Sequence, residues 1–204
     1  MAEGSDSPNT DTEEPLEPEL RAAPAARPVV RLVLKVLSEP TPVTRDAMVQ
    51  QVRDVYAAAG IDVVVVGAVE RLNLPLLNDL TVGACMVGNT TVEQRKLFAH
   101  RNGAGPKDIC VYFVRSMLPP FSGCATRAPI TAAFPAGRPS AVVASGASKW
   151  TLGHECGHVL GLEHVPPTNR LMIGEGTWNV APEPPSLIPT EIATIKASPF
   201  TQSP

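Results

Sequence analysis

The sequence predicts an α/β domain in which helices cover a mixed β-sheet. Short Val-rich runs alternate along the chain with segments whose apolar residues recur every three or four positions. The first unit has the order strand, helix, strand, which is typical of parallel pairing. The 22 prolines argue against a bundle made only of helices. Of the 204 residues, 44% are hydrophobic, which is enough for one hydrophobic core.

The strand–helix–strand unit spans residues 29–69. Residues 29–37 alternate between apolar and polar side chains, which predicts a half-buried strand. Residues 44–59 are predicted to form a helix that ends at Gly60, because glycine adopts the left-handed backbone that closes many helices. The apolar face of this helix is formed by Met48, Val52, Val55 and Tyr56. Residues 61–69 are more continuously apolar and are predicted to form a parallel strand after a right-handed crossover.

The middle of the chain is predicted to add one helix and one strand. Residues 71–88 show no clear periodicity and are expected to be irregular. Residues 91–100 are predicted to form a helix that begins after a capping threonine. Residues 109–115 are continuously apolar up to their last residue and are predicted to form a buried strand. Residues 119–137 contain Pro, Gly and small side chains, which predicts a loop.

The last third is predicted to contain a short strand and two helices. Residues 140–144 form the strand, and Pro139 before it favours a position at the sheet edge. Residues 149–160 are predicted to form a helix. A second long loop is expected over residues 166–189, and residues 190–197 are predicted to form the final helix.

The N-terminal segment differs in composition from the rest of the chain. Residues 1–20 carry seven acids and no basic residue, which predicts that residues 1–28 form a disordered, Pro-rich tail before a folded domain over residues 29–204. The alternative is a pro-segment that covers an active site. The segment lacks the positive and apolar regions of a secretory signal, so the chain as read is expected to be cytoplasmic.

Charge and hydropathy exclude two classes of partner. The formal net charge is −3, so the chain has no basic surplus for nucleic acid. No apolar run approaches the roughly 20 residues needed to span a bilayer, so no membrane association is expected. We expect a monomer.

The pattern that carries chemistry is H-E-x-x-H-x-x-G-x-x-H, formed by His154, Glu155, His158, Gly161 and His164. Residues four apart lie on one face of a helix, so the first two histidines can bind one ion. The glycine permits the turn that brings the third histidine back. Three of the chain's four histidines fall within these eleven residues, which is difficult to explain by core packing.

This ligand set predicts one catalytic zinc ion. Three neutral imidazoles leave an open position on a tetrahedral zinc, as in catalytic rather than structural sites. Zinc lowers the pKa of its bound water, and Glu155 lies where it can accept the proton as a general base. The predicted reaction is hydrolysis of a peptide bond, with a protein or peptide as substrate. Acids are few in the loops, so calcium is not indicated.

The motif resembles the zinc-binding signature of the metzincin clan of zinc endopeptidases. Members of that clan have a Met-containing turn beneath the zinc, and Met172, eight residues after His164, matches it. The resemblance covers residues 29–198. It implies a twisted mixed sheet with an edge strand over the cleft, a zinc-binding helix, a Met-turn and a C-terminal helix. It also favours a secreted protein.

Two positions place the chain among branches of the clan. Some branches have a tyrosine two residues after the methionine as a further zinc ligand, and this chain has Gly174 there. Matrixins usually have serine after the third histidine, where this chain has Val165. The sequence therefore looks most similar to bacterial-type, matrixin-like members.

The resemblance also implies substrate-binding residues. In the clan, an edge strand pairs antiparallel with the substrate, and residues 140–144 match that strand. The residues expected to contact substrate are Ala141, Val142, Val143 and Ala144. Trp178, in the specificity loop, is expected either to wall the pocket for the side chain after the cleaved bond or to anchor its loop.

The four cysteines divide into two kinds. Cys110 and Cys156 lie in apolar or helical segments and are predicted to be small core residues. Cys85 and Cys124 lie in loops and could form a disulfide if the protein reaches an oxidising compartment.

Two alternatives to a general endopeptidase stay open at this point. One is a zinc-bound module that binds peptides without turnover, although the presence of Glu155 argues against it. The other is a peptidase or amidase of narrow specificity, because long Pro-rich loops could restrict the cleft.

Overall fold

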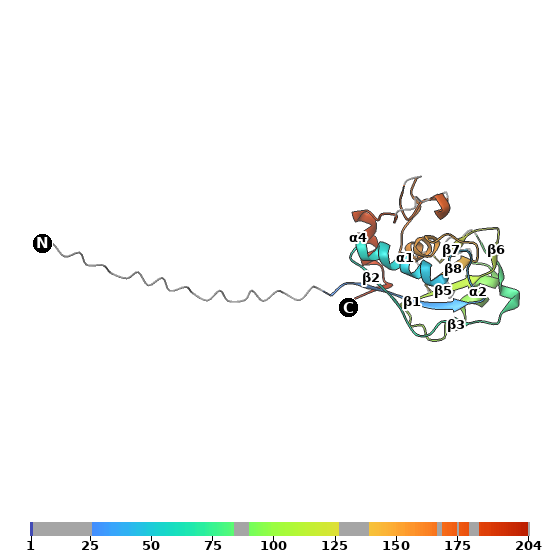
Figure 1. Cartoon of the computed structure of the whole chain (residues 1–204). Helices are drawn as coiled ribbons and strands as arrows, with labels where there is room; N and C mark the ends of the chain where they lie inside the picture. The colour runs from blue at the N-terminus through green and yellow to red at the C-terminus, as the bar shows by residue number, and fades with distance from the viewer. Residues whose placement is uncertain are drawn as a thin grey trace.

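The structure is a computed structural model of the chain. It describes residue 1 and residues 26–83, 90–126, 139–166, 169–174, 176–179 and 184–203. The strands of the main sheet are β1 (Val29–Val36), β2 (Asp62–Val65), β3 (Glu70–Arg71), β5 (Ile109–Val114), β7 (Gly123–Ala125), β8 (Ser140–Ala144) and β9 (Thr201–Gln202). Their order is β2-β1-β5-β8-β7, and β3 and β9 also pair with β1 (Figure 1). A small second sheet joins β4 (Asp79–Thr81) to β6 (Ser116–Leu118).

The main sheet is mixed, as predicted. Strand β1 is parallel to β2 and β5, and β5 is parallel to β8. Strand β7 runs antiparallel to β8, and β9 antiparallel to β1. The predicted parallel pairing across the first strand–helix–strand unit is confirmed by the register from Val29 opposite Asp62 to Leu32 opposite Val65.

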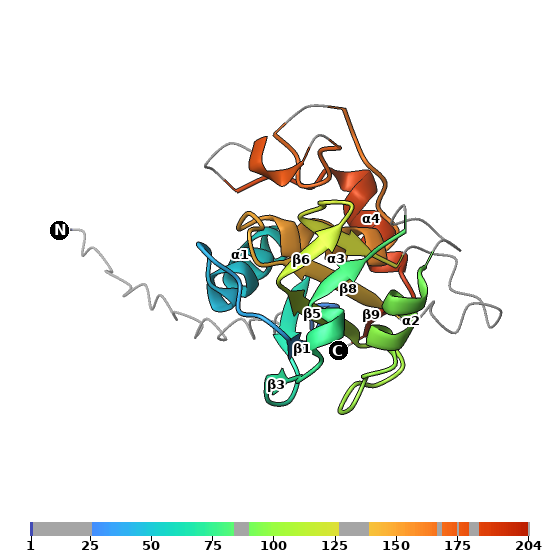
Figure 2. The same ribbon diagram turned by 90° about the vertical axis from the view of Figure 1, so that its right-hand side faces the viewer.

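The described residues form four helices and two 3-10 turns. The helices are α1 (Arg45–Ala58), α2 (Val92–Phe98), α3 (Thr151–Val159) and α4 (Pro189–Ala197), and the turns are η1 (Pro75–Leu77) and η2 (Thr177–Asn179). Helices α1, α3 and α4 pack on one face of the sheet, and α2 packs on the other with the small sheet (Figure 2). In β5, β7 and β8, successive residues enter the two cores alternately, as the period of two in a strand requires.

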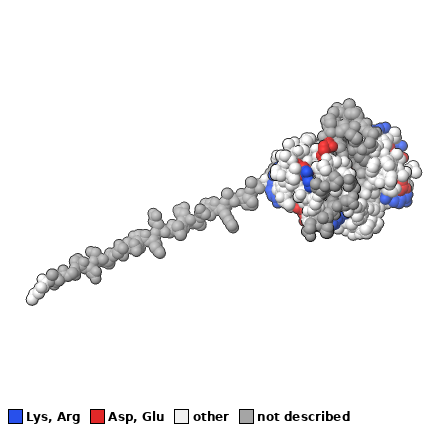
Figure 3. All heavy atoms as spheres, turned by 90° about the horizontal axis from the view of Figure 1, so that it is seen from above, with Lys and Arg blue, Asp and Glu red and all other residues white. Residues whose placement is uncertain are grey.

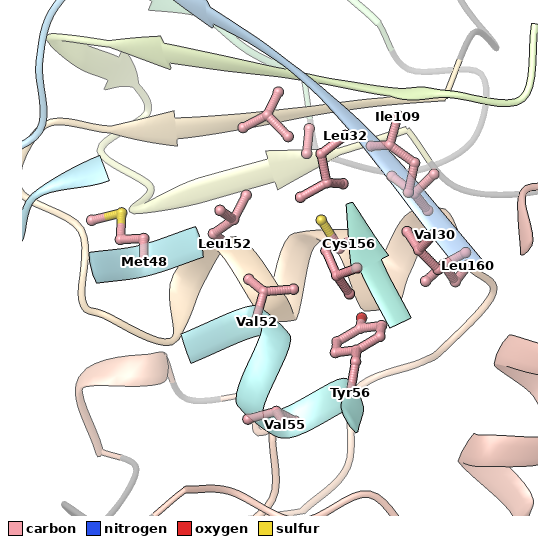
Figure 4. Close-up of a cluster of buried hydrophobic side chains, with 14 of the residues drawn as sticks. Val30, Leu32, Met48, Val52, Val55, Tyr56, Ile109, Leu152, Cys156 and Leu160 are labelled. Atoms are coloured by element: carbon pink, nitrogen blue, oxygen red, sulfur yellow. The ribbon is translucent and has the colours of Figure 1, made fainter. Parts of the chain in front are cut away.

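Helices α1 and α3 pack against each other through a shared hydrophobic core. The N-cap Thr44 accepts a hydrogen bond from the backbone N–H of Ala47, and Gly60 closes the segment after α1 at φ +73°. The fully buried Tyr56 donates from its hydroxyl to the carbonyl of Gly153 in α3 at 3.1 Å, and it lies beside Cys156 (Figure 4). This contact joins the first helix to the helix that carries the predicted metal ligands.

The prediction that residues 140–144 form the sheet edge is wrong. Strand β8 is paired on both sides, with β5 and with β7, and all five of its residues are buried. The backbone of Ala141–Ala144 is therefore not available to an extended peptide. The outer position belongs to β7, which falls inside the predicted loop. Its three residues, Gly-Cys-Ala, have no β-branched side chain, so no local pattern indicates a strand.

The irregular segment predicted over residues 71–88 also contains more structure than expected. It holds η1 and β4, and β4 pairs in parallel with β6. That pairing joins residues 37 positions apart, so a local pattern could not predict it. The predicted tail over residues 1–28 lies mostly outside the described residues.

The predictions for the two core cysteines are confirmed, whereas Cys124 lies in strand β7 and not in the predicted loop. Cys110 and Cys156 are free and fully buried. Cys124 is disulfide-bonded, and its predicted partner Cys85 lies outside the described residues.

In the described part of the chain, no helix has the length and apolar character needed to cross a bilayer. Lys and Arg side chains gather into no broad patch on the described surface seen in Figure 3.

Candidate metal centre

Helix α3 positions two of the three predicted metal ligands. Every residue of α3 is buried, and His154 and His158 lie one turn apart on it, with exposures of 5% and 4%. Gly161 follows with φ +103°, a backbone conformation that favours glycine. The backbone N–H of Leu162 donates to the carbonyl of Gly157 at 2.9 Å, and the chain then turns back to bring the exposed His164 toward the helix.

The three imidazoles converge on one point. The Nε2 atom of His164 lies 3.2 Å from Nε2 of His154 and 2.9 Å from Nε2 of His158. Zinc–nitrogen bonds of about 2.0–2.1 Å in a tetrahedral site would separate such atoms by about 3.3 Å. The arrangement therefore has the spacing that a zinc ion needs.

Backbone carbonyls fix the tautomers of the two helical histidines. Nδ1–H of His154 donates to the carbonyl of Leu171 at 2.8 Å, and Nδ1–H of His158 donates to the carbonyl of Leu162 at 2.8 Å. With the proton on Nδ1, the lone pair is on Nε2, which is the atom that faces the other rings. The donor set thus fits a divalent cation that prefers imidazole ligands.

Glu155 lies between the helix and the outer strand. Its side chain is only 6% exposed, and it contacts the backbone of Gly123 in β7. A Cβ built on Gly123 would lie 2.6 Å from both Cγ and Cδ of Glu155, closer than real contacts allow. The carboxylate therefore occupies space that exists because residue 123 has no side chain. No local sequence signal indicates this contact, since it joins residues 32 positions apart.

On the other side of α3, Cys156 faces the core. Burial raises the pKa of its thiol, and the nearby charge of Glu155 raises it further. The thiol therefore stays protonated. Cys156 packs in the core with Tyr56, as predicted for a small core residue (Figure 4).

Met172 lies beneath the helix. It is fully buried, and its Sδ would lie 2.6 Å from a Cβ built on Gly157, so the thioether packs directly on the helix backbone between His154 and His158. Its carbonyl accepts a hydrogen bond from Val165 N–H at 2.9 Å. This contact ties the turn that contains Met172 to the residue after His164.

A cavity of about 400 Å³ opens beside the three histidines. Its described lining comes from the β6–β7 connection and β7, from α3, and from the segments after His164. The lining residues are Pro120, Phe121, Ser122, Gly123, Thr151, His154, Glu155, His164, Ile173, Gly174, Gly176 and Thr177. No pattern in the sequence indicates a role for Phe121, Gly123, Thr151 or Thr177. Trp178 is 56% exposed and is not among the described lining residues, although its neighbour Thr177 is.

Sequence comparisons find no match, whereas structural comparisons find similar folds. No protein-family model matches the chain, and no curated protein matches it. The fold is similar to metalloproteinase-II from Bacteroides fragilis, with a TM-score of 0.63 and 16% identity over 89% of this chain. It is also similar to an archaemetzincin from Methanopyrus kandleri, with a TM-score of 0.50 and 16% identity over 82% of this chain.

The two matches differ in how much of the other protein they cover. The chain spans 56% of the metalloproteinase-II chain and 93% of the archaemetzincin chain. Together with the three converging histidines, two of which lie on α3, they show that the fold is of the metzincin type, with a mixed sheet and a helix that carries possible metal ligands.

Proposed function

We propose that this chain, whose fold is that of the metzincin zinc peptidases, is a zinc-dependent endopeptidase. The observation that carries the proposal is the convergence of three Nε2 atoms beside a carboxylate that lines the same cavity. His154, His158 and His164 would hold the ion. When bound, zinc would supply Lewis acidity, which activates a water molecule and polarises a peptide carbonyl.

Glu155 is the proposed general base and acid. It accepts a proton from the attacking water on a carboxylate oxygen and then donates that proton to the nitrogen of the leaving amine. Its position supports this role, because it follows His154 directly on α3 and lines the cavity without being one of the converging ligands. Contact with Gly123 holds the carboxylate in place.

The outer strand β7 replaces β8 as the proposed substrate-binding strand. Among the described strands, β7 pairs only with β8, and its first residue, Gly123, lines the cavity. An extended peptide could therefore add to the side of β7 that faces away from β8, through main-chain hydrogen bonds. Met172 is the proposed Met-turn residue, because it packs against α3 between the ligand positions and holds the turn under the triad.

Replacement of Gly123 by alanine is expected to reduce kcat about 100-fold while zinc stays bound, because the new Cβ displaces the Glu155 carboxylate. Kinetics on a fluorogenic peptide and zinc content by mass spectrometry measure the two effects. Gly146→Ala is the matched control, since a Cβ there meets nothing within 4 Å and neither glycine needs a left-handed backbone. Full activity of Gly123→Ala would contradict the positioning of Glu155 by β7.

Metal removal tests the proposed function itself. We expect one zinc per chain by mass spectrometry and cleavage of a quenched peptide library, with cleavage lost in 1,10-phenanthroline and restored by added zinc. One zinc without cleavage of any library member would refute a general endopeptidase and favour a peptide-binding module or an enzyme with one narrow substrate. Absence of zinc from protein purified without chelator would refute the ligand assignment.

A further inference from the structure

A second cavity lies on the face of the main sheet that α2 covers, opposite the face that carries α3. It has a volume of about 490 Å³ and is open to solvent between η1 and the end of α2. We call it the α2 groove. The residues that line it and matter here are Leu74, Pro75, Leu76 and Leu77 on one side and Lys96 and His100 on the other.

The two sides of the α2 groove differ in chemistry. The side formed by η1 is apolar, and its Leu76 is 88% exposed, which is typical of a surface that another chain segment covers. The other side carries Lys96 from the last turn of α2 and His100 just after it. Neither side chain makes an ion pair with another described residue, and the described lining contains no acid. The groove therefore suits an occupant that combines a large apolar side chain with carboxylates.

The N-terminal segment of this chain has that composition. Residues 1–20 contain seven acids and no basic residue, and four of the acids fall within residues 13–19. The same stretch contains Leu16 and is followed by Leu20, and these are the only large apolar side chains in residues 2–20. Residues 2–25 lie outside the described residues. The chain thus has an acidic, leucine-containing segment whose charge is opposite to that of the groove.

The length of chain selects one of the two leucines. Leucine 16 is ten residues before Ala26, so the extended chain between them covers at most about 33–36 Å. The groove lies beside the C-terminal end of β1, because the backbone N–H of Leu72 donates to the carbonyl of Val36 at 2.8 Å. The eight residues of β1 span about 26 Å. Leu16 can therefore reach the groove along β1, whereas the six residues from Leu20 to Ala26 cover only about 20–22 Å.

We propose that residues 13–20 of the same chain bind in the α2 groove, with Leu16 against Leu76 and the neighbouring glutamates near Lys96 and His100. The groove and the three histidines belong to opposite faces of the sheet, so the bound segment leaves the cavity beside the histidines open. This arrangement differs from a pro-segment over the active site. It goes beyond the proposed peptidase function and does not depend on it.

Digestion of the full chain with a glutamate-specific endopeptidase tests the binding, because a bound segment is cleaved only when it is released. The cleavage sites are the bonds after Glu13 and Glu19. Leu76→Asp places a carboxylate in the groove and should raise the cleavage rate at these bonds about tenfold. It leaves the cleaved sequence itself unchanged. Leu118→Asp is the matched control, because it changes an exposed leucine of β6 outside the groove, and it should be digested like the wild type.

Cross-linking with a carbodiimide, which joins an amine directly to a carboxylate, tests where the segment binds. We expect an amide between Lys96 and a glutamate of residues 13–19, identified by peptide mass spectrometry. Leu16→Asp should lower its yield about tenfold, because a leucine contact is lost, whereas Leu20→Asp should keep it. Lys107, an exposed lysine outside the groove, is the internal reference for random coupling.

Three outcomes would overturn the inference. Equal digestion rates for wild type and Leu76→Asp would show that the groove does not hold the segment. An equal acceleration in Leu118→Asp would indicate a general effect of surface charge. In a mixture of ¹⁵N-labelled and unlabelled protein, Lys96 cross-links that join the two kinds of chain would show that a second copy supplies the segment. Neither measurement uses turnover, so this inference and the proposed function can fail separately.

Discussion

The Glu155→Gln variant is expected to bind zinc and to have lost peptide hydrolysis by a factor of about 10²–10⁴ or more. Glutamine has the shape of glutamate and can occupy the same space against Gly123. It cannot accept the proton of the attacking water or return one to the leaving amine. The three imidazoles are unchanged, so the metal content should equal that of the wild-type protein. Fluorogenic peptide kinetics and mass spectrometry test both expectations.

A matched control is available on the opposite face of the main sheet. Glu93→Gln changes a glutamate of α2, whose carboxylate accepts a hydrogen bond from Thr81 N–H, an interaction that glutamine can retain. This variant should keep both zinc and activity. If Glu155→Gln kept its activity, the proposal that Glu155 is the general base would be refuted. Loss of zinc together with activity would indicate that Glu155 supports the metal centre instead of the proton transfer.

The His158→Ala variant is expected to lose the metal and to be much less stable. The substitution removes one of the three converging Nε2 atoms and leaves the carbonyl of Leu162 without its 2.8 Å hydrogen bond in a buried site. Truncation in the core together with a lost hydrogen bond should lower the free energy of unfolding by about 2–4 kcal/mol. For a domain of this size, that corresponds to roughly 5–15 °C in Tm.

Metal binding adds to this difference, because the energy of binding to the folded state also stabilises the fold. Chelator should therefore lower the Tm of the wild-type protein and leave that of His158→Ala unchanged. His100→Ala is the control, because it changes the one histidine outside the motif, and the contact that Tyr112 makes there is to the backbone carbonyl. Stoichiometric zinc in His158→Ala would refute the assignment of this ligand.

Sequence alone predicted those parts of the protein that depend on local spacing. His154 and His158 are four residues apart, so any helix places them together. The turn at Gly161 requires a backbone that favours glycine, which made the return of His164 predictable. The same holds for the first strand–helix–strand unit, where apolar periodicity and the glycine after α1 define the elements.

The sequence did not predict the elements and contacts that depend on pairing between residues far apart in the chain. Strand β7 exists because Gly123–Ala125 pair with β8, and nothing in its three residues indicates a strand. The prediction of a sheet edge at Ser140–Ala144 rested on Pro139 and on the resemblance, whereas β7 takes the outer position among the described strands. The contact of Gly123 with Glu155 and that of Thr177 with Thr151 likewise join segments 26 or more residues apart. The role of Trp178 stays a prediction.

The composition of α3 has a consequence for the order in which the protein folds. Its nine residues include two glycines, and Gly157 is required because Met172 packs where a side chain would lie. Glycine within a helix costs about 1 kcal/mol relative to alanine, so this segment has little tendency to be helical by itself. Helix α3 should therefore form only after the sheet and α1 have assembled around it. The segment that carries the chemistry would then be a late product of folding, and damage to it would mainly accelerate unfolding.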